Sequence, residues 1–537
     1  MSRITKAKYM EWIVGRPGGS DVVRGYIEGD EAACSFFGRH FASLDDFRSK
    51  AEEVDGRFDR EARERAVEAL IVPPGADAAR LTAFVEQGGY MVTTGQQPGL
   101  FGGPLYSIHK ALTAVRLAET LEKALGKPVI PVFWVASEDH DWAEANHADV
   151  IGTDNELHRV ELAAPDDSVH PAIHRIPTGE AITVEVDKFL QLLPQTDFSA
   201  EYFELIRGAF SPDATLADGF HKVVQELLGR FGLFFTDAAN PALKRHSADA
   251  LLVELDRSEE MENVLTETAQ ALEAGGFALQ VPILPGGVNL FLDGPAGRER
   301  LYREGEAFQQ RTSKTNVTRE EIRAAQSEDA TVLSPNVLFR PVVESSVFPT
   351  LSYVGGPGEM AYFAQQKDYF AAHGIEMPVI FPRFSAAPVE TKIRKVLDKF
   401  DLQVSDLHRP FHEIAGDIAR DEVPPEARKA LGGLRGAIGK SVGELTQAVK
   451  PIDPTLKGPV QHIRSQSFAA IDELEKKIVH ALKRENEIAL GQLEKAQVHL
   501  FPLGKPAERV QNPFYFLTRY GGAVLDELYD AFRVNLS

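Results

Sequence analysis

The chain has 537 residues, of which 43% are hydrophobic and 26% charged, with a formal net charge of -21. This length predicts two or more packed units, and the composition is typical of a folded globular protein. The acidic excess argues against extended contact with a nucleic-acid backbone, which requires Lys and Arg to displace counterions. Cys34 is the single cysteine, which excludes an internal disulfide and a cysteine-based metal cluster.

Segments that would direct the chain to a membrane are not found in the sequence. Residues 1–20 contain no apolar stretch of signal-peptide length. The apolar run at 129–136 is far too short to span a bilayer, and the low cysteine content suits a reducing compartment. We therefore expect a soluble cytoplasmic protein with no membrane partner and no nucleic-acid partner.

The predicted elements begin with about ninety residues that are mostly helical and charged. A short β-branched run at 89–95, closed by glycine, predicts a buried strand. A helix is predicted at about 105–125, ended by a glycine cap, and a second strand at 128–135. A strand, a long helix and a strand within about fifty residues form a βαβ unit, which predicts a parallel sheet.

Three more strands are predicted, at 231–237, 350–354 and 378–383, the last of these being the last strand of the chain. The pattern predicts an α/β fold in which residues 1–390 form a Rossmann-like, doubly wound parallel sheet. Two insertions are expected within it, at about 151–212 and 274–336. The second insertion should contain a hairpin around 288–295.

Residues 391–503 are predicted to form a purely helical arm. Helices at about 425–449 and 454–501 are joined by a proline-containing turn and carry apolar residues among Glu, Lys and Gln. This predicts a coiled-coil-like hairpin that packs on itself or on a second subunit. The remaining segment, 504–537, is expected to pack back on the core.

The first predicted strand and its helix are joined by a turn that contains four glycines. Glycine lets the backbone approach a ligand closely, and helix N-termini bind anions. We predict nucleotide contacts from Gly95, Gln96 and Gln97, and catalytic contacts to phosphate or an oxyanion from His109 and Lys110 in an exposed turn. The alternative is a tight turn with an ordinary surface lysine. The spacing matches neither the dinucleotide fingerprint nor a P-loop.

Acidic and imidazole side chains follow the second strand of this unit directly. We predict that Glu138, Asp139 and His140 are catalytic and bind an amine or a sugar hydroxyl. One alternative is a solvated helix start, since acids favour the first turn. Another is a metal site, because His140, Glu144 and His147 have helical ligand spacing; our prediction is that the protein has no metal site of its own.

A second glycine-rich turn follows the strand at 350–354. We predict that Gly355, Gly356, Gly358 and Glu359 contact the nucleotide, because turns after parallel strands converge on one crevice. The alternative is a helix entry capped by an acid.

Two arginines lie between apolar residues, where a lone charge is unfavourable. Arg340 and Arg383 therefore either bind an anionic ligand or pair with an internal acid, and we predict that Arg383 contacts the nucleotide. Asp237 and Asn240 are weaker candidates. Cys34 lies away from every cluster, and we reject it as a nucleophile.

Six segments together resemble one known family, the cysteine-adding ligases of bacillithiol biosynthesis. These segments are 95–100, 103–110, 133–141, 355–359, 377–383 and 512–521. The resemblance implies a Rossmann-like core, a coiled-coil arm used for dimer contact, nucleotide binding and ligase activity. It also implies an architecture related to class I aminoacyl-tRNA synthetases, whose His-Ile-Gly-His signature is matched here by 106–109 in its final histidine only. Arg383, Ser385 and Lys392 stand near the place of their lysine-serine loop.

We therefore predict a homodimeric enzyme that adds L-cysteine to glucosaminyl-malate, the last step of bacillithiol synthesis. ATP is expected as the activating nucleotide, with Mg²⁺ as its companion and AMP or ADP as the product, so that adenylate and acyl-phosphate routes both stay open. Two alternatives remain: nucleotidyl transfer to another small substrate, and a non-catalytic scaffold for pathway enzymes.

Overall fold

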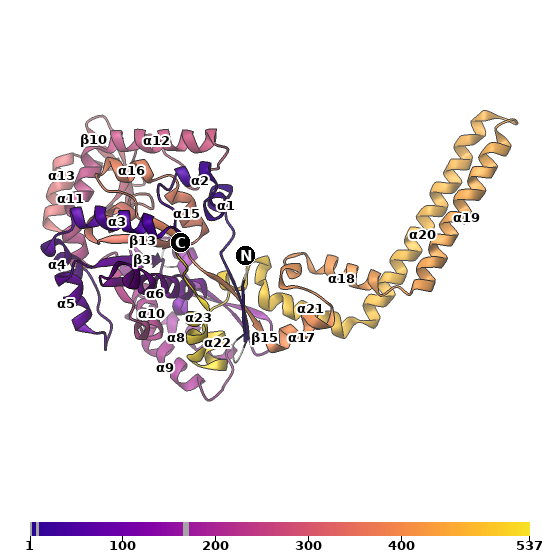
Figure 1. Ribbon diagram of the computed structural model, residues 1–537, viewed down its shortest axis with the longest axis horizontal. Coiled ribbons are helices and arrows are strands. Elements are labelled where there is room, and N and C mark those ends of the chain that lie inside the picture. Colours follow the sequence, from indigo (N-terminus) through magenta and orange to yellow (C-terminus); the bar gives the residue numbers. More distant parts are fainter. Residues whose placement is uncertain (1–2, 7–9, 165–170) are drawn as a thin grey trace. The chain divides into compact units, whose positions relative to one another are not determined.

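The computed structural model describes residues 3–6, 10–164 and 171–537 (Figure 1). Residues 165–170 of the first expected insertion lie outside this description. The chain forms two compact units: Met1–Pro388 together with Glu508–Ser537, and Val389–Ala507. The second unit is therefore inserted, in the sequence, between two parts of the first.

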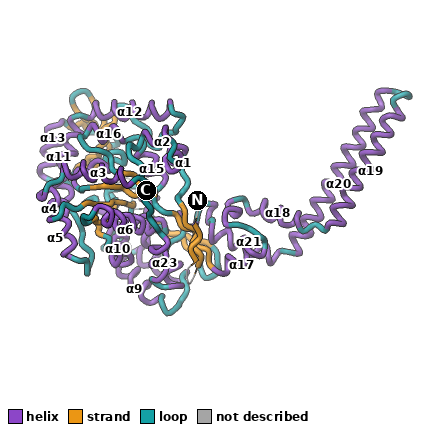
Figure 2. The backbone as a smooth tube through the Cα atoms, viewed as in Figure 1, coloured by secondary structure: helices purple, strands orange, loops and turns teal. Residues whose placement is uncertain are grey.

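The first unit is built on a parallel sheet of five strands, visible at its centre in Figure 2. The prediction of a Rossmann-like, doubly wound parallel sheet is confirmed. In spatial order the strands are β14 (Val379–Pro382), β13 (Thr350–Gly355), β3 (Tyr90–Gln96), β4 (Val129–Val135) and β7 (Phe234–Asp237).

Apolar side chains on both faces explain why these segments form strands in the interior. Every residue of β4 is buried, as are the first six of β3. Parallel strands covered by helices on both faces require such continuous apolar runs. Helix α6 (Tyr106–Leu125) connects β3 to β4 and ends at Gly126, whose left-handed backbone (φ 67°) forms the C-cap.

The strand order creates a switch point beside β3. The chain runs from β3 to β4 and β7 on one side, and β13 and β14 lie on the other. The turns that leave β3 and β13 therefore diverge to opposite sides of the sheet and leave a crevice at the strands' carboxyl ends. Ligands of doubly wound proteins bind in such crevices.

The remaining strands form three smaller sheets. The second insertion forms an antiparallel sheet of β11 (Asn316–Val317), β10 (Ala307–Gln310), β9 (Gly297–Glu304), β8 (Gly287–Gly294) and β12 (Leu333–Pro335). Strands β5 (His147–Ile151) and β6 (Leu157–Glu161) form a hairpin, and β1 (Arg3–Lys6), β2 (Met10–Gly15) and β15 (Ser385–Glu390) form a third sheet. The expectation that 378–383 is the last strand is wrong, because β15 follows it.

Helices cover the sheets of the first unit. Those in the first ninety residues confirm the predicted helical character of that region, apart from strands β1 and β2. The helices besides α6 are α1 (Asp21–Glu28), α2 (Glu31–Ser35), α3 (Leu44–Arg57), α4 (Arg60–Glu68), α5 (Ala78–Glu86), α7 (Trp142–Ala145), α8 (Ala181–Leu192), α9 (Ser199–Ala209), α10 (Leu216–Leu228), α11 (Pro241–Asp256), α12 (Ser258–Ala274), α13 (Arg319–Glu328), α14 (Arg340–Val347), α15 (Pro357–Phe363), α16 (Lys367–Ala372), α22 (Phe514–Tyr520) and α23 (Ala523–Ala531).

The second unit is helical and contains an antiparallel hairpin, seen as two adjacent helices in Figures 1 and 2. Val442, Val460 and Ile471 are buried in it, while Arg435 bridges to Glu475 at 2.8 Å. Its helices are α17 (Thr391–Lys399), α18 (Phe411–Asp421), α19 (Pro425–Val449), α20 (Lys457–Glu485) and α21 (Glu487–Leu500), of which α19 and α20 form the hairpin. The arm with its coiled-coil hairpin is as predicted.

One detail of the arm differs from the expectation. The single helix predicted for 454–501 is interrupted at Asn486, which separates α20 from α21. The Asn486 amide donates to Glu422 and, at 3.2 Å, to the carbonyl of Leu482. An asparagine side chain that bonds to nearby backbone competes with the helical ladder. Among the described residues, no helix is long and apolar enough to cross a membrane.

Candidate functional site

A cavity of about 650 Å³ lies at the carboxyl edge of the parallel sheet, within the first unit. The turn after β3, the end of β4, the second insertion and the turn after β13 all contribute to its wall. Eleven of the thirteen residues predicted to be catalytic or to contact the nucleotide line it: Gly95, Gln96, Gln97, Lys110, Glu138, Asp139, His140, Gly356, Gly358, Glu359 and Arg383. The structure thus brings the three sequence motifs together, whereas Gly355 and His109 are not among the lining residues.

The first turns of α6 contain a lysine whose hydrogen bonds are already engaged. The ammonium of Lys110 donates to the Gly95 carbonyl and, at 3.2 Å, to Oε1 of Gln96, and it lies 2.6 Å from the Glu359 carboxylate. An ammonium has three donors, so this lysine is held in place by protein acceptors. Its charge can act on a ligand in the cavity, but a direct bond to phosphate requires one of these contacts to open.

Glu359 links the two glycine-rich turns. Besides Lys110, it accepts hydrogen bonds from the Tyr353 hydroxyl at 2.5 Å and from the Gly356 amide at 2.8 Å. Burial alone would raise the pKa of Glu359, but Lys110 and these two donors lower it overall. Burial lowers the pKa of Lys110, and Glu359 opposes that shift. The carboxylate therefore fixes the turn after β13 against α6, as the alternative reading of a capped helix entry anticipated.

The glycines leave backbone surface bare at the cavity wall. A Cβ atom at Gly95 would lie 2.9 Å from the Trp134 carbonyl oxygen, which is closer than side chains tolerate. A Cβ at Gly358 would meet only Gln280, at 4.0 Å, so it would project into open space. The first glycine is required by the packing of β3 on β4, and the second keeps room for a ligand.

His109 is placed differently from the expectation of an exposed turn. Its side chain is completely buried, and its Nδ1 lies 2.9 Å from Oε2 of Glu508. Burial lowers the pKa of His109, although Glu508 opposes the shift. Residues adjacent on a helix point about 100° apart, so α6 directs Lys110 to the cavity and His109 to the interior.

Glu508 connects His109 to the cavity wall. Its Oε1 pairs with the Arg383 guanidinium at 2.7 Å, and its Oε2 accepts bonds from the Ser385 hydroxyl at 2.8 Å and the Ala386 amide at 3.1 Å. Burial by itself would raise the pKa of Glu508, but Arg383 and His109 hold it far below its usual range. For Arg383, the structure thus shows an internal ion pair on a residue that also lines the cavity. Glu508 was not identified as a site residue from the sequence, because a long helical segment separates it from the residues it contacts.

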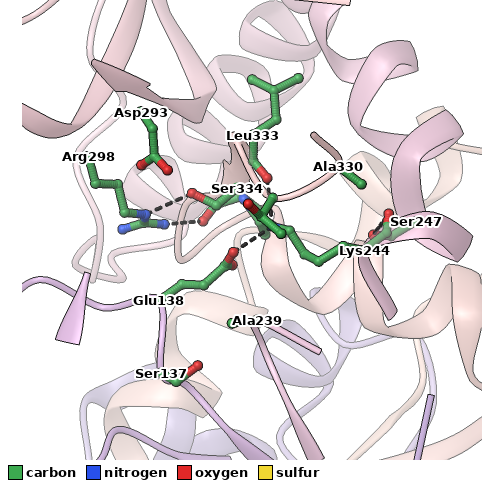
Figure 3. A network of polar contacts seen from close by, with 12 residues as sticks. Ser137, Glu138, Ala239, Lys244, Ser247, Asp293, Arg298, Ala330, Leu333 and Ser334 are labelled. Atoms are coloured by element: carbon green, nitrogen blue, oxygen red, sulfur yellow. Dashed lines mark hydrogen bonds and ion pairs between the residues drawn. The ribbon is translucent and has the colours of Figure 1, made fainter. Parts of the chain in front are cut away.

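Glu138 is also tied to an internal cation, as Figure 3 shows. The ammonium of Lys244 on α11 lies 2.5 Å from the Glu138 carboxylate and donates to the Leu333 carbonyl at 2.6 Å. Both Lys244 and Glu138 are buried. The pair anchors the end of β4 to the second insertion, and Lys244 was not found from the sequence because its partner is distant in the chain.

Asp139 and His140 are more accessible. The exposed fractions of their side chains are 37% and 38%. Oδ1 of Asp139 accepts the backbone amides of His140 and Asp141, which orders the loop at the end of β4. Within the described ranges, no group of three or more His, Cys, Asp or Glu side chains is arranged to hold a metal ion.

Arginines that the sequence reading did not single out line the wall formed by the second insertion. Arg298 donates to the Ser334 hydroxyl at 2.8 Å (Figure 3). It also donates to the Pro335 carbonyl at 2.7 Å. Arg300 follows two residues later on β9 and also lines the cavity. Alternate residues of a strand share a face. The two-residue spacing of Arg298 and Arg300 could therefore have predicted that they lie together, if β9 had been predicted as a strand.

The remaining candidates have structural partners. Arg340 pairs with Glu344 at 2.6 Å and also lines the cavity. Asp237 accepts the Ser137 hydroxyl, and burial raises the pKa of Asp237. Asn240 accepts the Ala242 amide at 2.9 Å as the N-cap of α11.

The charge of the cavity differs from that of the whole chain. Although the net charge is -21, cationic side chains outnumber carboxylates among the described residues that line it. The cations are Lys110, Arg298, Arg300, Arg340, Arg383 and Arg509, and the carboxylates are Glu138, Asp139, Glu144 and Glu359. The arrangement therefore suits anionic ligands, since local charge can oppose net charge.

Comparison with known proteins gives two family matches that together cover nearly the whole chain. Residues 8–384 match the family described as "Bacillithiol biosynthesis BshC, N-terminal Rossmann-like domain". Residues 386–535 match "Bacillithiol biosynthesis BshC, C-terminal coiled-coil domain".

Individual relatives agree with these matches. A protein of Salinibacter ruber named "Putative cysteine ligase BshC" is 33% identical over 447 residues, which cover 83% of this chain and 81% of that protein. Proteins of the same name from Heliobacterium modesticaldum and Carboxydothermus hydrogenoformans are 30% and 28% identical, over 94% and 95% of this chain and 92% and 95% of theirs. The chain therefore belongs to the BshC family of bacillithiol biosynthesis.

Proposed function

We propose that this protein is a ligase that joins the carboxyl group of L-cysteine to the amine of glucosaminyl-malate, with ATP as the source of activation. Membership of the BshC family supports the ligase assignment, because relatives carry the name of a cysteine ligase. The structural observation that carries the proposal is the cavity at the switch point of the sheet, with bare glycine backbone and an excess of cations.

The wall formed by the two glycine-rich turns fits a phosphate-bearing nucleotide. Gly356 and Gly358 leave the backbone accessible, and a Cβ at Gly356 would lie 3.6 Å from Nε of Arg383. Lys110 and Arg383 place positive charge beside this surface, although each is also bound to a protein carboxylate. Bound there, ATP would supply the activation that a carboxylate lacks at neutral pH, and Mg²⁺ would accompany its phosphates.

The chain's own residues would position the reacting groups and move a proton. An amine attacks a carbonyl only in its neutral form, so a nearby base has to accept a proton from the ammonium. Asp139 lines the cavity with an accessible carboxylate, and burial, Asp141 and Asp139 raise the pKa of Glu144. We assign proton acceptance to Asp139 with Glu144 as the second candidate, and assign to Glu138 the task of holding this loop through Lys244.

The test is a reaction of purified protein with ATP labelled at the α and γ phosphates, L-cysteine and glucosaminyl-malate. The expected result is the cysteinyl product together with one nucleotide product for each amide bond. AMP with pyrophosphate indicates activation by adenylyl transfer, and ADP with phosphate indicates phosphoryl transfer.

Omission of single substrates separates this proposal from the alternatives. Release of pyrophosphate in the absence of cysteine would favour nucleotidyl transfer to another substrate. Absence of binding of all three compounds in isothermal titration would favour a scaffold. Product formation without nucleotide turnover would show that cysteine arrives already activated, and the ATP assignment would then be wrong.

A further inference from the structure

We propose that Arg298 and Arg300 form a carboxylate-binding subsite that recognises the malate part of the amino-sugar substrate. The inference rests on the proposed function and names the side chains that would select its acidic acceptor. Both arginines lie on strand β9 of the second insertion, on one face, and both line the cavity. They are thus specificity-determining residues supplied by the insertion rather than by the Rossmann-like core.

Arg298 is a rigidly held cation that forms no ion pair with any residue the structure describes. It donates from Nε to the Ser334 hydroxyl, from Nη2 to the Pro335 carbonyl and from Nη1 to the His140 ring at 3.2 Å. Its guanidinium carbon lies 3.9 Å from the centre of the Phe291 ring. A guanidinium has five N–H donors, so three are engaged by uncharged acceptors and two remain for a ligand.

Arg300 is held in the same manner. Its Nε donates to the Val288 carbonyl at 3.0 Å, and its Nη2 approaches the Asn289 side-chain oxygen at 3.5 Å. Within the described parts of the chain, neither Arg298 nor Arg300 forms an ion pair with a carboxylate. In contrast, Lys110, Arg340 and Arg383 are each paired with one.

The surrounding acids do not neutralise this pair. Glu138, Asp139 and Asp293 are the acids near Arg298. Glu138 and Asp293 are each engaged by another cation, Lys244 at 2.5 Å and Arg175 at 2.6 Å respectively. Asp139 accepts two backbone amides of its own loop and forms no ion pair with Arg298 among the described residues. Burial lowers the pKa of Arg298 and of Arg300, because removal from water outweighs the effect of the nearby acids. A ligand carboxylate placed here would balance the positive charge of the two guanidinium groups and accept paired N–H donors from them.

The location favours a carboxylate of the acceptor over a phosphate of the nucleotide. His140 contacts Arg298 directly, and the carboxylate of Asp139, assigned above to the amine, stands beside it in the chain. An acidic neighbour disfavours a polyphosphate but suits a zwitterionic acceptor whose amine and carboxylates are both recognised. The glycine-rich turns, where we place the nucleotide, instead follow β3 and β13.

The experiment measures binding of L-malate to the full-length protein by ligand-observed NMR, with inorganic phosphate as the competing probe. We expect malate to bind, and Arg300→Gln to weaken that binding at least about 10-fold, the usual effect of losing a charge-assisted hydrogen bond. The same variant should raise KM for glucosaminyl-malate by a similar factor with kcat nearly unchanged. With methyl glucosaminide, which has the same amine on a neutral aglycone, KM should not change.

Lys314→Gln is the matched control, because Lys314 is a cation exposed on the same insertion and does not line the cavity. Arg298→Gln is a second variant that should act in the same direction, and circular dichroism verifies that each variant is folded. Malate binding that Arg300→Gln leaves unchanged, or binding of phosphate in preference to malate, would overturn the subsite. Malate binding that is lost in Arg300→Gln, in a protein that makes no cysteinyl product, would support the subsite and contradict the proposed ligase.

Discussion

Glu508 lies 2.7 Å from Arg383, although the two residues are 125 positions apart and a complete helical unit separates them in the sequence. The same carboxylate binds His109 and Ser385. The buried carboxylate of Glu508 thus orients Arg383 at the cavity wall. It also provides a buried partner for His109, which we had predicted to be in the site.

Glu508→Gln should destabilise the first unit by about 3–5 kcal/mol, because it leaves the charge of Arg383 buried without its partner. Urea unfolding followed by tryptophan fluorescence measures this, since Trp12, Trp134 and Trp142 all lie in that unit. Glu376→Gln is the control: Glu376 pairs with Arg39 at 2.6 Å but is 43% exposed, and such pairs contribute about 1 kcal/mol at most. Equal effects of both changes would contradict the assigned role of Glu508.

The stability of wild type should fall as the pH is lowered from 7 to 5, in part because of His109. Burial holds the folded-state pKa of His109 below its usual value near 6.5, so the unfolded chain binds the proton more readily. A group of this kind stabilises the fold above the unfolded pKa and loses that contribution as the pH falls. His109→Gln should therefore reduce the slope of unfolding free energy by up to about 1.4 kcal/mol per pH unit. Identical slopes would refute this.

The Glu508 contribution should be lost at lower pH. Its folded pKa is depressed, so the carboxylate stabilises the protein above the unfolded value of about 4.3 and ceases to do so as the pH falls towards the folded value. Wild type should lose more stability than Glu508→Gln between pH 5 and pH 3. Denaturant titrations at each pH measure how much stability each protein loses. Between pH 8 and pH 6 the two proteins should lose the same amount.

Glu138→Gln should mainly reduce stability, whereas Asp139→Asn should mainly reduce activity. Glu138 is buried against Lys244, so its replacement should cost about 3 kcal/mol of stability. Asp139 is accessible, so Asp139→Asn should leave stability nearly unchanged while lowering kcat for glucosaminyl-malate more than the affinity for ATP. Steady-state kinetics, ATP titration and thermal unfolding test this. Loss of ATP binding in Asp139→Asn would reverse the assignment of the two parts of the cavity.

The arm should hold two subunits together. Apolar side chains remain exposed on its hairpin, among them Ile463 at 52% and Leu474 at 46%. Covering them in a dimer would remove apolar surface from water. Deletion of 402–501 with a short bridge should give a monomer in sedimentation velocity, and Ile463→Glu should weaken the dimer. Intact protein that sediments as a monomer would end this hypothesis.

The arrangement of the core could be predicted because its signals are local. A short β-branched run at 89–95 and an apolar run at 128–135 flank a helix with a glycine cap, and these patterns depend on the immediate sequence alone. Strand β15 was missed because it follows β14 directly and contains a proline and small residues. The break at Asn486 was missed because its side chain bonds to Glu422, which is remote in the sequence.

The candidate site was predicted only in part, since side-chain direction depends on packing. His109 and Lys110 are neighbours in the sequence, and only the packing of α6 decides which of them lies on the cavity side. The partners of Glu138 and Arg383 come from α11 and from the segment after the arm, and no local pattern marks either one. Glycine-rich turns after strands, in contrast, gave reliable positions because strand order alone brings them together.

The bond between His109 and Glu508 joins residues 399 positions apart. Helices form within microseconds, whereas closing so long a stretch of chain carries an entropic penalty that must be met before the contact stabilises anything. During refolding from urea, helical circular dichroism should therefore recover well before the cavity can bind a ligand. A compact, largely helical species with an open wall at Arg383 should accumulate in between, and its exposed apolar surface would make it the species most prone to aggregation.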